Sequence, residues 1–413
     1  MLRISQRMSD AFASLKFRDF RFLVLGQFGS SMGMWMDQVA RGWLIYEMTG
    51  SPFLLGLAGA LKAAPMLFLS IFAGVIADRY SRKKLMMMSQ AVSVALHLTL
   101  AVLIVTHTVE VWHVLTTALL LGIAQVFDQP ARSVMVSDLV DSKHLNNAIS
   151  LNSVAFNISR TLGPSIAGLA VAVTGAGGSY FVQAFVYLLT IFFTAHITEP
   201  PKEKRALESG QARNNMLQDM LAGFKYIKSD KIIIALLLVG LVPTLLAQPY
   251  QSLMPIFAKD ILKVGPQGFG LLLGFTGVGS IIGALYAGTL SRGRALGSNL
   301  LVLATAFGGL LVVFAFSPFY ALSISLLVGI GFTQTGYNVL NNTLVQTHSP
   351  AELRGRIMGV YFLDRGMMPL GTLLAGAMAG WIGAPHTVSI LGASCAVLVV
   401  AIAVLIPKMR RIR

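Results

Sequence analysis

Charged residues inside otherwise apolar stretches are the part of this sequence that could do chemistry. Asp37 and Arg41 stand four residues apart in the first such stretch, and Lys62 stands in the second. At the centre of a membrane-spanning helix each charge costs roughly 2.5 to 3.5 kcal/mol, so such residues need a charged partner or a wet cavity. A desolvated carboxylate can take up a proton near physiological pH, although nearby cations oppose this. We therefore interpret these three residues as candidates for proton or substrate coupling.

Helix geometry predicts which of these charges meet. Residues four apart share one face of a helix, which places Asp37 beside Arg41. Two antiparallel helices joined by a turn near Gly50 would bring Asp37 and Lys62 to the same depth, about 18 Å from the turn at roughly 1.5 Å per residue. Asp37 is thus expected to reach Lys62, Arg41 or both. Two interpretations stay open, namely a site whose charge changes during transport and a permanent ion pair that only joins the first two helices.

Further charges lie in later apolar stretches. Asp128 and Arg132 form a second pair four residues apart, whereas Arg160 stands alone in its stretch. Asp364 and Arg365 are adjacent, so on a helix they point about 100° apart and cannot both face one partner. We interpret Arg160, Asp364 and Arg365 as possible substrate contacts. Either arginine could receive a carboxylate or catecholate of a substrate, or instead a carboxylate of the protein.

The stretches that carry these charges are long enough to cross a membrane. Of the 413 residues, 55% are hydrophobic and 12% charged, which is about half the charged share of a soluble chain. A membrane-spanning helix needs roughly 20 apolar residues, whereas the strands of a β-barrel would be about ten residues long with alternating polarity. Apolar stretches recur at 20–47, 52–77, 85–106, 111–134, 146–174, 179–198, 231–258, 267–290, 298–316, 319–346, 357–381 and 385–407. The sequence therefore predicts an all-α polytopic membrane protein with twelve transmembrane helices.

A single long polar stretch divides these helices into two sets of six. We predict an N-terminal bundle, a cytoplasmic linker with a short amphipathic helix, and a C-terminal bundle, over residues 1–198, 199–230 and 231–413. Arg160 precedes Pro164 by four residues, and Arg365 precedes Pro369 by four in the equivalent stretch of the second half. Such internal repetition is typical of transporters that build a binding site between two halves. The two six-helix bundles are thus expected to be pseudo-symmetric.

The distribution of cations predicts the orientation. With a cytoplasmic N-terminus, 26 of the 32 Lys and Arg residues face the cytoplasm, and only Lys259 and Lys263 lie in an outside loop. This bias places both termini in the cytoplasm. The segment up to Arg21 is basic and amphipathic, without the apolar core of a cleavable signal peptide. Because the net charge of +15 is spread over separate short loops, it predicts contact with the lipid bilayer and no nucleic-acid partner.

Several short motifs indicate a family. The loop after the second stretch reads Gly74-x3-Asp78-Arg79-x2-Arg82-Lys83-Lys84, which resembles motif A of major facilitator superfamily transporters. Further likenesses are FDQPAR at 127–132, NNAISLN at 146–152 and ELRGR at 352–356. Together these motifs resemble the transmembrane secretion effector branch of that superfamily, which is similar to enterobactin exporters and macrolide efflux proteins.

Small residues predict close helix contacts in two stretches. Gly163-Pro164-x3-Gly168 resembles a shortened form of the motif found in the fifth helix of antiporters, and we interpret it as a helix-packing motif. Gly279 and Gly283 stand four residues apart in the eighth stretch. Pairs of this spacing let two helix backbones approach closely.

The resemblance implies a charge network at the cytoplasmic rim, here called the latch. It would comprise Gly74, Asp78, Arg79, Arg82, Asp128 and Arg132. Asp78 would face the start of the eleventh helix, where the helix dipole favours an anion. Asp128 would hold a motif A arginine, Arg82 or Arg79. The latch would close the cytoplasmic side when the cavity opens outward, and a role in membrane topology alone is the alternative.

Other classes of function find little support in the residues. The seven histidines are scattered and Cys395 is the single cysteine, so neither a metal site nor a cofactor is predicted. No catalytic set is visible, and the absence of a Walker A pattern excludes ATP as the direct energy source. We expect a monomeric secondary active transporter of a bacterial inner membrane, a proton-coupled exporter of small amphipathic drug-like or siderophore-like molecules that works by alternating access. The alternatives are a lipid or metabolite transporter without proton coupling and a non-transporting sensor.

Overall fold

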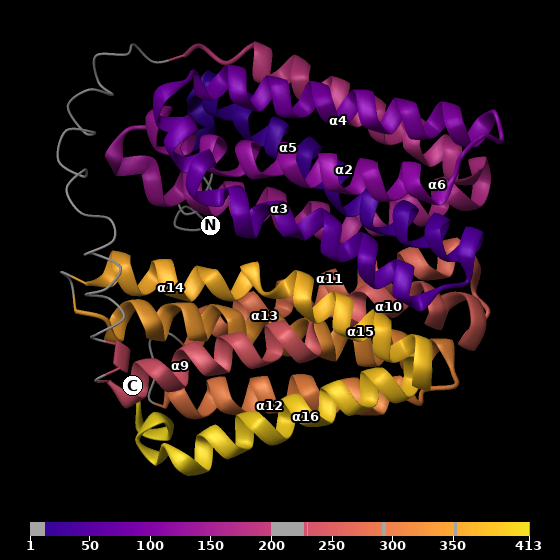
Figure 1. Ribbon diagram of the computed structural model, residues 1–413. Coiled ribbons are helices and arrows are strands. Elements are labelled where there is room, and N and C mark those ends of the chain that lie inside the picture. Colours follow the sequence, from indigo (N-terminus) through magenta and orange to yellow (C-terminus); the bar gives the residue numbers. More distant parts are fainter. Residues whose placement is uncertain (1–12, 200–226, 229, 291–294, 351–352, 413) are drawn as a thin grey trace, which may run out of the picture. The chain divides into compact units, whose positions relative to one another are not determined.

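The computed structural model describes residues 13–199, 227–228, 230–290, 295–350 and 353–412, and all regular elements of these residues are helical (Figure 1). Side chains are described for these residues except 70–75, 77–79, 356, 362–365 and 411. Eight helices in the described part are long and apolar enough to cross a membrane, judged by length and composition. The predicted amphipathic helix of the linker lies almost entirely outside the described residues.

The first half contains long helices joined by short turns. They are η1 (Ala13–Lys16), α2 (Arg18–Thr49), α3 (Pro52–Arg79), α4 (Arg82–Val105), α5 (Val111–Asp138), η2 (Ser142–His144) and α6 (Leu145–Ala195). Within α6, Gly175 has φ 72° and ψ 176°, a conformation that glycine adopts without a Cβ penalty. This residue divides α6 into two spans, at the break that the apolar stretches predicted.

The second half is more interrupted. It comprises α9 (Lys231–Val242), η4 (Pro243–Ala247), α10 (Tyr250–Ile256), η5 (Phe257–Ile261), α11 (Gly265–Leu290), α12 (Leu296–Ala315), α13 (Tyr320–His348), α14 (Arg354–Gly366), α15 (Met368–Ile382), α16 (Ala384–Leu405) and η6 (Pro407–Arg411). Because proline lacks an N–H, Pro243 and Pro255 disturb the helical ladder, and the π-helical turns η4 and η5 lie beside α10. Counting Lys231–Ile261 as one span and α14 with α15 as another, each of the twelve predicted spans has a helical counterpart among the described residues.

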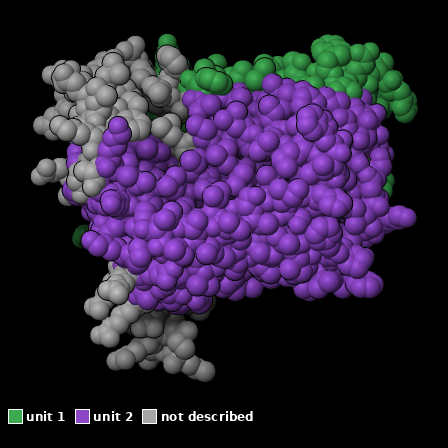
Figure 2. All heavy atoms as spheres, turned by 60° about the horizontal axis from the view of Figure 1, so that its bottom comes forward, with its two compact units in different colours: residues 1–44, 68–212 green, residues 45–67, 213–413 purple. Residues whose placement is uncertain are grey.

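The chain packs as two compact units, coloured separately in Figure 2. Unit 1 comprises Met1–Leu44 and Phe68–Ala212, and unit 2 comprises Ile45–Leu67 and Arg213–Arg413. In unit 1, α4 packs against both α5 and α6. One end of unit 1 has an apolar core that includes Phe20, Leu23, Met86 and Met135, each fully buried. This core holds the ends of α2, α4 and α5 together.

Glycines set the closest helix contacts within each unit. In unit 2, a Cβ on Gly279 would lie 1.9 Å from the carbonyl oxygen of Val328, and one on Gly283 would lie 2.2 Å from that of Phe332. Both contacts join α11 to α13, which confirms the predicted close approach. In unit 1, a Cβ on Gly33 of α2 would lie 2.4 Å from the ring of Tyr187 on α6. The small residue therefore positions an aromatic ring that belongs to the candidate site.

Candidate functional site

Asp37 and Arg41 form a buried ion pair on α2, as their spacing predicted. Nη2 of Arg41 lies 2.8 Å from Oδ1 of Asp37, and Nε donates to both carboxylate oxygens at 3.1 and 3.2 Å. Nη1 donates to the carbonyl oxygen of Val114 at 2.7 Å and to the hydroxyl of Thr117 at 2.9 Å, both on α5. The two charged residues are 1% and 4% exposed. Arg41 therefore joins α2 to α5 through the same side chain that neutralises Asp37.

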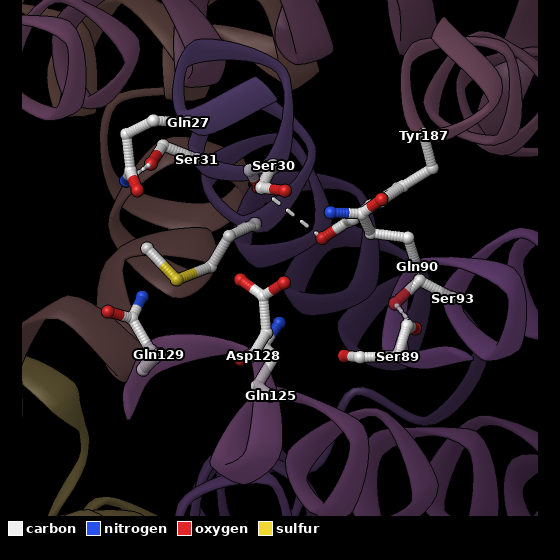
Figure 3. Close-up of a pocket in the computed structure, with 11 residues that line it drawn as sticks. Gln27, Ser30, Ser31, Ser89, Gln90, Ser93, Gln125, Asp128, Gln129 and Tyr187 are labelled. Atoms are coloured by element: carbon white, nitrogen blue, oxygen red, sulfur yellow. Dashed lines mark hydrogen bonds between the residues drawn. The ribbon is translucent and has the colours of Figure 1, made fainter. Parts of the chain in front are cut away.

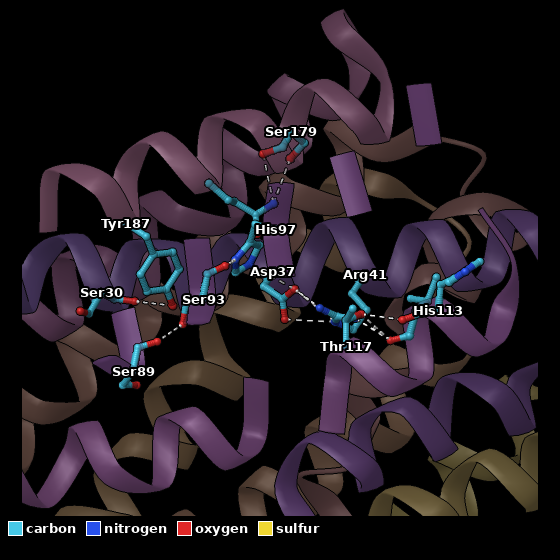
Figure 4. A network of polar contacts seen from close by, with 12 residues as sticks. Ser30, Asp37, Arg41, Ser89, Ser93, His97, His113, Thr117, Ser179 and Tyr187 are labelled. Atoms are coloured by element: carbon cyan, nitrogen blue, oxygen red, sulfur yellow. Dashed lines mark hydrogen bonds and ion pairs between the residues drawn. The ribbon is translucent and has the colours of Figure 1, made fainter. Parts of the chain in front are cut away.

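His97 on α4 is a third titratable residue at this pair (Figure 4). Its Nε2 lies 3.7 Å from Oδ1 of Asp37, and its Nδ1 lies 2.5 Å from the carbonyl oxygen of Ser93. The imidazole stacks on the ring of Tyr187 with centroids 5.3 Å apart and planes 23° apart, and its centroid is 5.9 Å from that of Tyr180. Both tyrosines lie on α6. Three helices thus converge on one carboxylate.

A polar hollow in unit 1 lies beside this cluster (Figure 3). Its empty space is about 370 Å³, including the part that is open to solvent. The lining comes from α2, α4, α5 and α6 and consists of Gln27, Ser30, Ser31, Met34, Ser89, Gln90, Ser93, Gln125, Asp128, Gln129 and Tyr187. Gln90 is 1% exposed, and neither end of its amide has a hydrogen-bond partner among the described residues. A buried amide that makes no protein contact can bond a ligand or water instead.

Asp128 and Arg132 form the second predicted ion pair, on α5. Nη2 of Arg132 lies 3.1 Å from Oδ1 of Asp128, and Nε lies 3.2 Å from Oδ2. Nη2 also donates to the hydroxyl of Ser30 on α2 at 2.9 Å. Asp128 lines the hollow, whereas Arg132 is 1% exposed and lies behind it.

In the described part of the motif A loop, Arg82 and Lys83 make contacts that the resemblance did not imply. Arg82 pairs with Asp138 at the end of α5, not with Asp128. The physical reason is depth, because Asp128 lies ten residues before Asp138, or about 15 Å along the helix at roughly 1.5 Å per residue. Lys83 donates to the carbonyl oxygens of Ala195 and Ile197, at 2.6 and 2.8 Å, and so caps the end of α6. Contacts of Asp78 and Arg79, and the surroundings of Gly74, lie outside the described side chains.

The structure describes the remaining predicted site residues only in part. Arg160 lies over the indole ring of Trp35, 5.4 Å from its centroid. Lys62 belongs to the part of α3 that packs in unit 2, so its predicted approach to Asp37 stays a prediction. The side chains of Asp364 and Arg365 on α14 lie outside the described set.

The helix-packing motif of the fifth span lies against α2. A Cβ on Gly163 would be 2.8 Å from the Cβ of Trp35 and 3.2 Å from the carbonyl oxygen of Met32. Pro164 and Gly168 are buried in the same helix. The contact holds α6 close to the helix that carries Asp37.

Sequence reasoning missed His97 and the glutamines of the hollow. A signal was present, because Ser89, Ser93 and His97 recur every four residues in an apolar stretch and so form one polar stripe. On α6, Tyr180, Gln183 and Tyr187 follow one another at intervals of three and four residues, and all three are buried. Periodic polar residues within apolar spans could therefore have indicated the inward faces of α4 and α6.

The chain resembles known transporters over most of its length. It is 26% identical to the staphyloferrin A transporter of Staphylococcus aureus, over 88% of this chain and 90% of that protein. It is 27% identical to the multidrug efflux pump Tap of Mycolicibacterium fortuitum, over 91% and 92% of the two chains. It is 26% identical to the enterobactin exporter EntS of Shigella boydii, over 89% and 86%.

Solved structures of similar fold are also transporters. A bacterial homolog of the human lysosomal transporter Spinster has a TM-score of 0.75 at 14% identity, over 95% of this chain and 97% of that one. The nucleoside transporter NupG has a TM-score of 0.73 at 13% identity, over 96% and 100%. At 13% and 14% identity, these similarities show a shared fold.

The all-helical fold and the match to a family model together define a multi-pass membrane protein of the major facilitator class, in which each of the twelve predicted spans has a helical counterpart among the described residues. Residues 9–413 match the transmembrane secretion effector family, and the chain belongs to that family.

Proposed function

We propose that this protein is a proton-coupled exporter of small amphipathic molecules of drug or siderophore type, which works by alternating access in a bacterial inner membrane. The observation that carries the proposal is the buried Asp37–Arg41 pair beside a polar hollow, both within apolar helices of unit 1. Intramembrane charges are expensive and mark substrate or proton pathways. An exporter that is not driven by ATP needs a site at which the inward movement of a proton can be coupled to the outward movement of substrate.

The substrate class is inferred from the relatives and from the hollow. The relatives named above include a siderophore transporter, a siderophore exporter and a multidrug pump. Amides and hydroxyls of the hollow offer both donors and acceptors, and Met34 adds an adaptable apolar contact. A ligand with several hydrogen-bonding groups on an apolar frame fits that lining. Arg160, Asp364 and Arg365 are proposed as additional contacts for an anionic group.

The remaining residues are assigned to the conformational cycle. Asp78 and the motif A cations would lie at the cytoplasmic rim, with both termini on that side, and open or close the latch. Because Arg82 bonds Asp138, that pair joins the latch, and Arg79 is the motif A arginine proposed to pair with Asp128. The two bundles, over 1–198 and 231–413, would rock as a monomer about the site, with the linker 199–230 between them.

The experiment that tests the proposal uses inverted membrane vesicles with an imposed pH gradient. Ethidium, enterobactin and a macrolide are offered in turn, and accumulation is followed together with proton release from the lumen. Substrate-dependent proton release is expected for one of these probes. Transport that ignores the gradient would support a lipid or metabolite transporter without proton coupling, and no transport of any probe would favour a sensor.

The variant that tests the site is Asp37→Asn. It should abolish gradient-driven transport in protein that still elutes as a folded monomer, because the exchangeable charge is lost. Glu47→Gln is the matched control, since Glu47 is an exposed carboxylate on the same helix. Unchanged coupling in Asp37→Asn would reduce the pair to a structural ion pair between helices.

A further inference from the structure

We infer that the exchangeable proton of unit 1 binds to Nε2 of His97, in the gap between the imidazole and Asp37, and that Asp37 acts as its charge partner. The inference rests on the proposed proton coupling but assigns the proton to a residue that the ion-pair argument did not use. Its basis is the position of both ring nitrogens, the neighbouring rings of Tyr187 and Tyr180, and the link from Asp37 through Arg41 to α5. Figure 4 shows His97 with Tyr187, Asp37 and Arg41.

The tautomer of His97 follows from its neighbours. Nδ1 lies 2.5 Å from the carbonyl oxygen of Ser93, and a carbonyl oxygen can only accept, so Nδ1 carries the hydrogen of the neutral ring. Nε2 is then a bare lone pair, and it has no hydrogen-bond partner among the described residues. It lies 3.7 Å from Oδ1 of Asp37, which is also an acceptor. Two acceptors face each other, and a proton between them would turn this gap into a charge-assisted hydrogen bond.

Charged and aromatic groups act on such a proton from two helices. From α2, Asp37 attracts it and Arg41 opposes it, and Lys62 is predicted to approach the same carboxylate. From α6, Tyr187 stacks on the ring and Tyr180 lies tilted beside it. The faces of aromatic rings attract cations, so these tyrosines stabilise an imidazolium as well as orient it.

The second ion pair adds one more anion and one more cation on α5. Asp128 and Tyr187 both line the hollow, and Arg132 donates to the hydroxyl of Ser30, whose carbonyl oxygen accepts from Tyr187. Because their charges oppose each other, the carboxylate of Asp37 remains the dominant partner of His97.

Water can deliver the proton from the hollow. Ser93 and Tyr187 line the hollow and also contact the His97 ring. A hydronium ion there would transfer its proton to the Nε2 lone pair, forming the N–H bond and leaving water. The new N–H would donate to Oδ1 of Asp37, the oxygen that also accepts from Nη2 of Arg41. Release reverses these steps.

Protonation would therefore change a contact between helices. With His97 charged, the imidazolium attracts the carboxylate of Asp37 in competition with Arg41, and the Asp37–Arg41 interaction weakens. Arg41 also bonds Val114 and Thr117, so the change reaches α5 directly. A proton on α4 is thus coupled to the position of α2 relative to α5 inside unit 1.

The test is magnetic resonance of the full-length protein in lipid nanodiscs, with the histidine ring nitrogens isotopically labelled. One resonance, absent in His97→Gln, should report an Nδ1–H tautomer at high pH and an imidazolium at low pH. His196→Gln is the matched control. His196 makes the same Nδ1 contact to a carbonyl four residues earlier and has two aromatic neighbours, but its ring is exposed.

Two further variants test the partners of the proton. Asp37→Asn should weaken proton binding at His97 by at least about tenfold, the effect typical of removing an opposite charge at this distance. Tyr187→Leu should also weaken proton binding at His97, while leaving the Asp37–Arg41 ion pair intact. This variant tests the inference if Asp37→Asn does not fold. An Nε2–H tautomer, or a titration that Tyr187→Leu and Asp37→Asn leave unchanged, would overturn the inference.

The titration needs no substrate, so its failure differs from failure of the proposed function. If His97 titrates as described but no probe is transported together with protons in vesicles, the inferred proton site is supported and the proposed exporter function is contradicted. If vesicles show coupled transport while His97 keeps one protonation state throughout, the proton lies elsewhere and the inference is wrong.

Discussion

All three nitrogens of the Arg41 guanidinium donate hydrogen bonds, and their acceptors lie on two helices. Nε and Nη2 donate to the carboxylate of Asp37. Nη1 donates to the carbonyl oxygen of Val114 and to the hydroxyl of Thr117, both on α5. A lysine could not make these contacts together, because its ammonium is a single point charge. At the scale of residues, the site therefore combines a cation whose three nitrogens all donate hydrogen bonds with a buried amide, that of Gln90, which has no hydrogen-bond partner among the described residues.

Gln90→Leu should separate stability from transport. Both ends of the buried amide lack a partner among the described residues, so its replacement should leave the free energy of unfolding unchanged or raise it by up to about 3 kcal/mol. Transport of the probe should fall, because a donor and an acceptor are lost from the hollow. Thermal unfolding in detergent and vesicle transport measure the two effects. Gln27→Leu is the control, since it breaks a 2.6 Å bond to Ser31 and should cost about 1 kcal/mol. A Gln90→Leu protein that unfolds would contradict this assignment.

At the scale of elements, small residues decide how closely helices pack. Gly279 and Gly283 let the backbone of α11 touch that of α13, and Gly331 of α13 would place a Cβ 2.0 Å from the carbonyl oxygen of Thr276 in return. Contact between two backbones leaves no flexible side chain that could move aside. Unit 2 therefore cannot accommodate larger side chains at these glycines, where α11 contacts α13.

Gly279→Ala is expected to destabilise unit 2. Its Cβ would lie 1.9 Å from a backbone oxygen, and overpacking of this kind typically costs about 1–3 kcal/mol. Gly309→Ala on α12 is the matched control, because a Cβ there meets no atom within 4 Å. That change should be neutral or slightly stabilising, since alanine favours a helix more than glycine does. Thermal unfolding of both variants decides the matter, and equal midpoints would refute the packing argument.

At the scale of the whole molecule, the charges at the motif A loop link the fold to motion. Lys83 caps α6 and Arg82 bonds Asp138, so the described part of this loop joins three helices of unit 1. Asp78, at the end of α3, is the group that the resemblance assigns to the start of the eleventh helix. If that assignment holds, the latch acts on the balance between conformations and not on substrate binding.

Asp78→Asn should therefore slow turnover while leaving affinity unchanged. A carboxylate at a helix N-terminus contributes roughly 0.3–2 kcal/mol, so turnover should fall about 2- to 30-fold. Turnover is measured in proteoliposomes, and affinity by quenching of tryptophan fluorescence with the same probe. Asp141→Asn, an exposed carboxylate in the loop after α5, should change neither quantity. Unaltered turnover in Asp78→Asn would leave the loop with a role in topology only.

The sequence by itself determined the spans and the local charge pairs. Membrane-length apolar stretches predict helices because backbone groups in lipid must be satisfied within the helix. Asp37 with Arg41 and Asp128 with Arg132 follow from the four-residue repeat alone, since both partners belong to one helix. Only the tertiary structure decided that His97 faces Asp37, that Arg82 takes Asp138, and that four helices enclose a polar hollow. These contacts depend on the rotation and depth of separate helices, where a shift of one residue turns a side chain by about 100° and points it elsewhere.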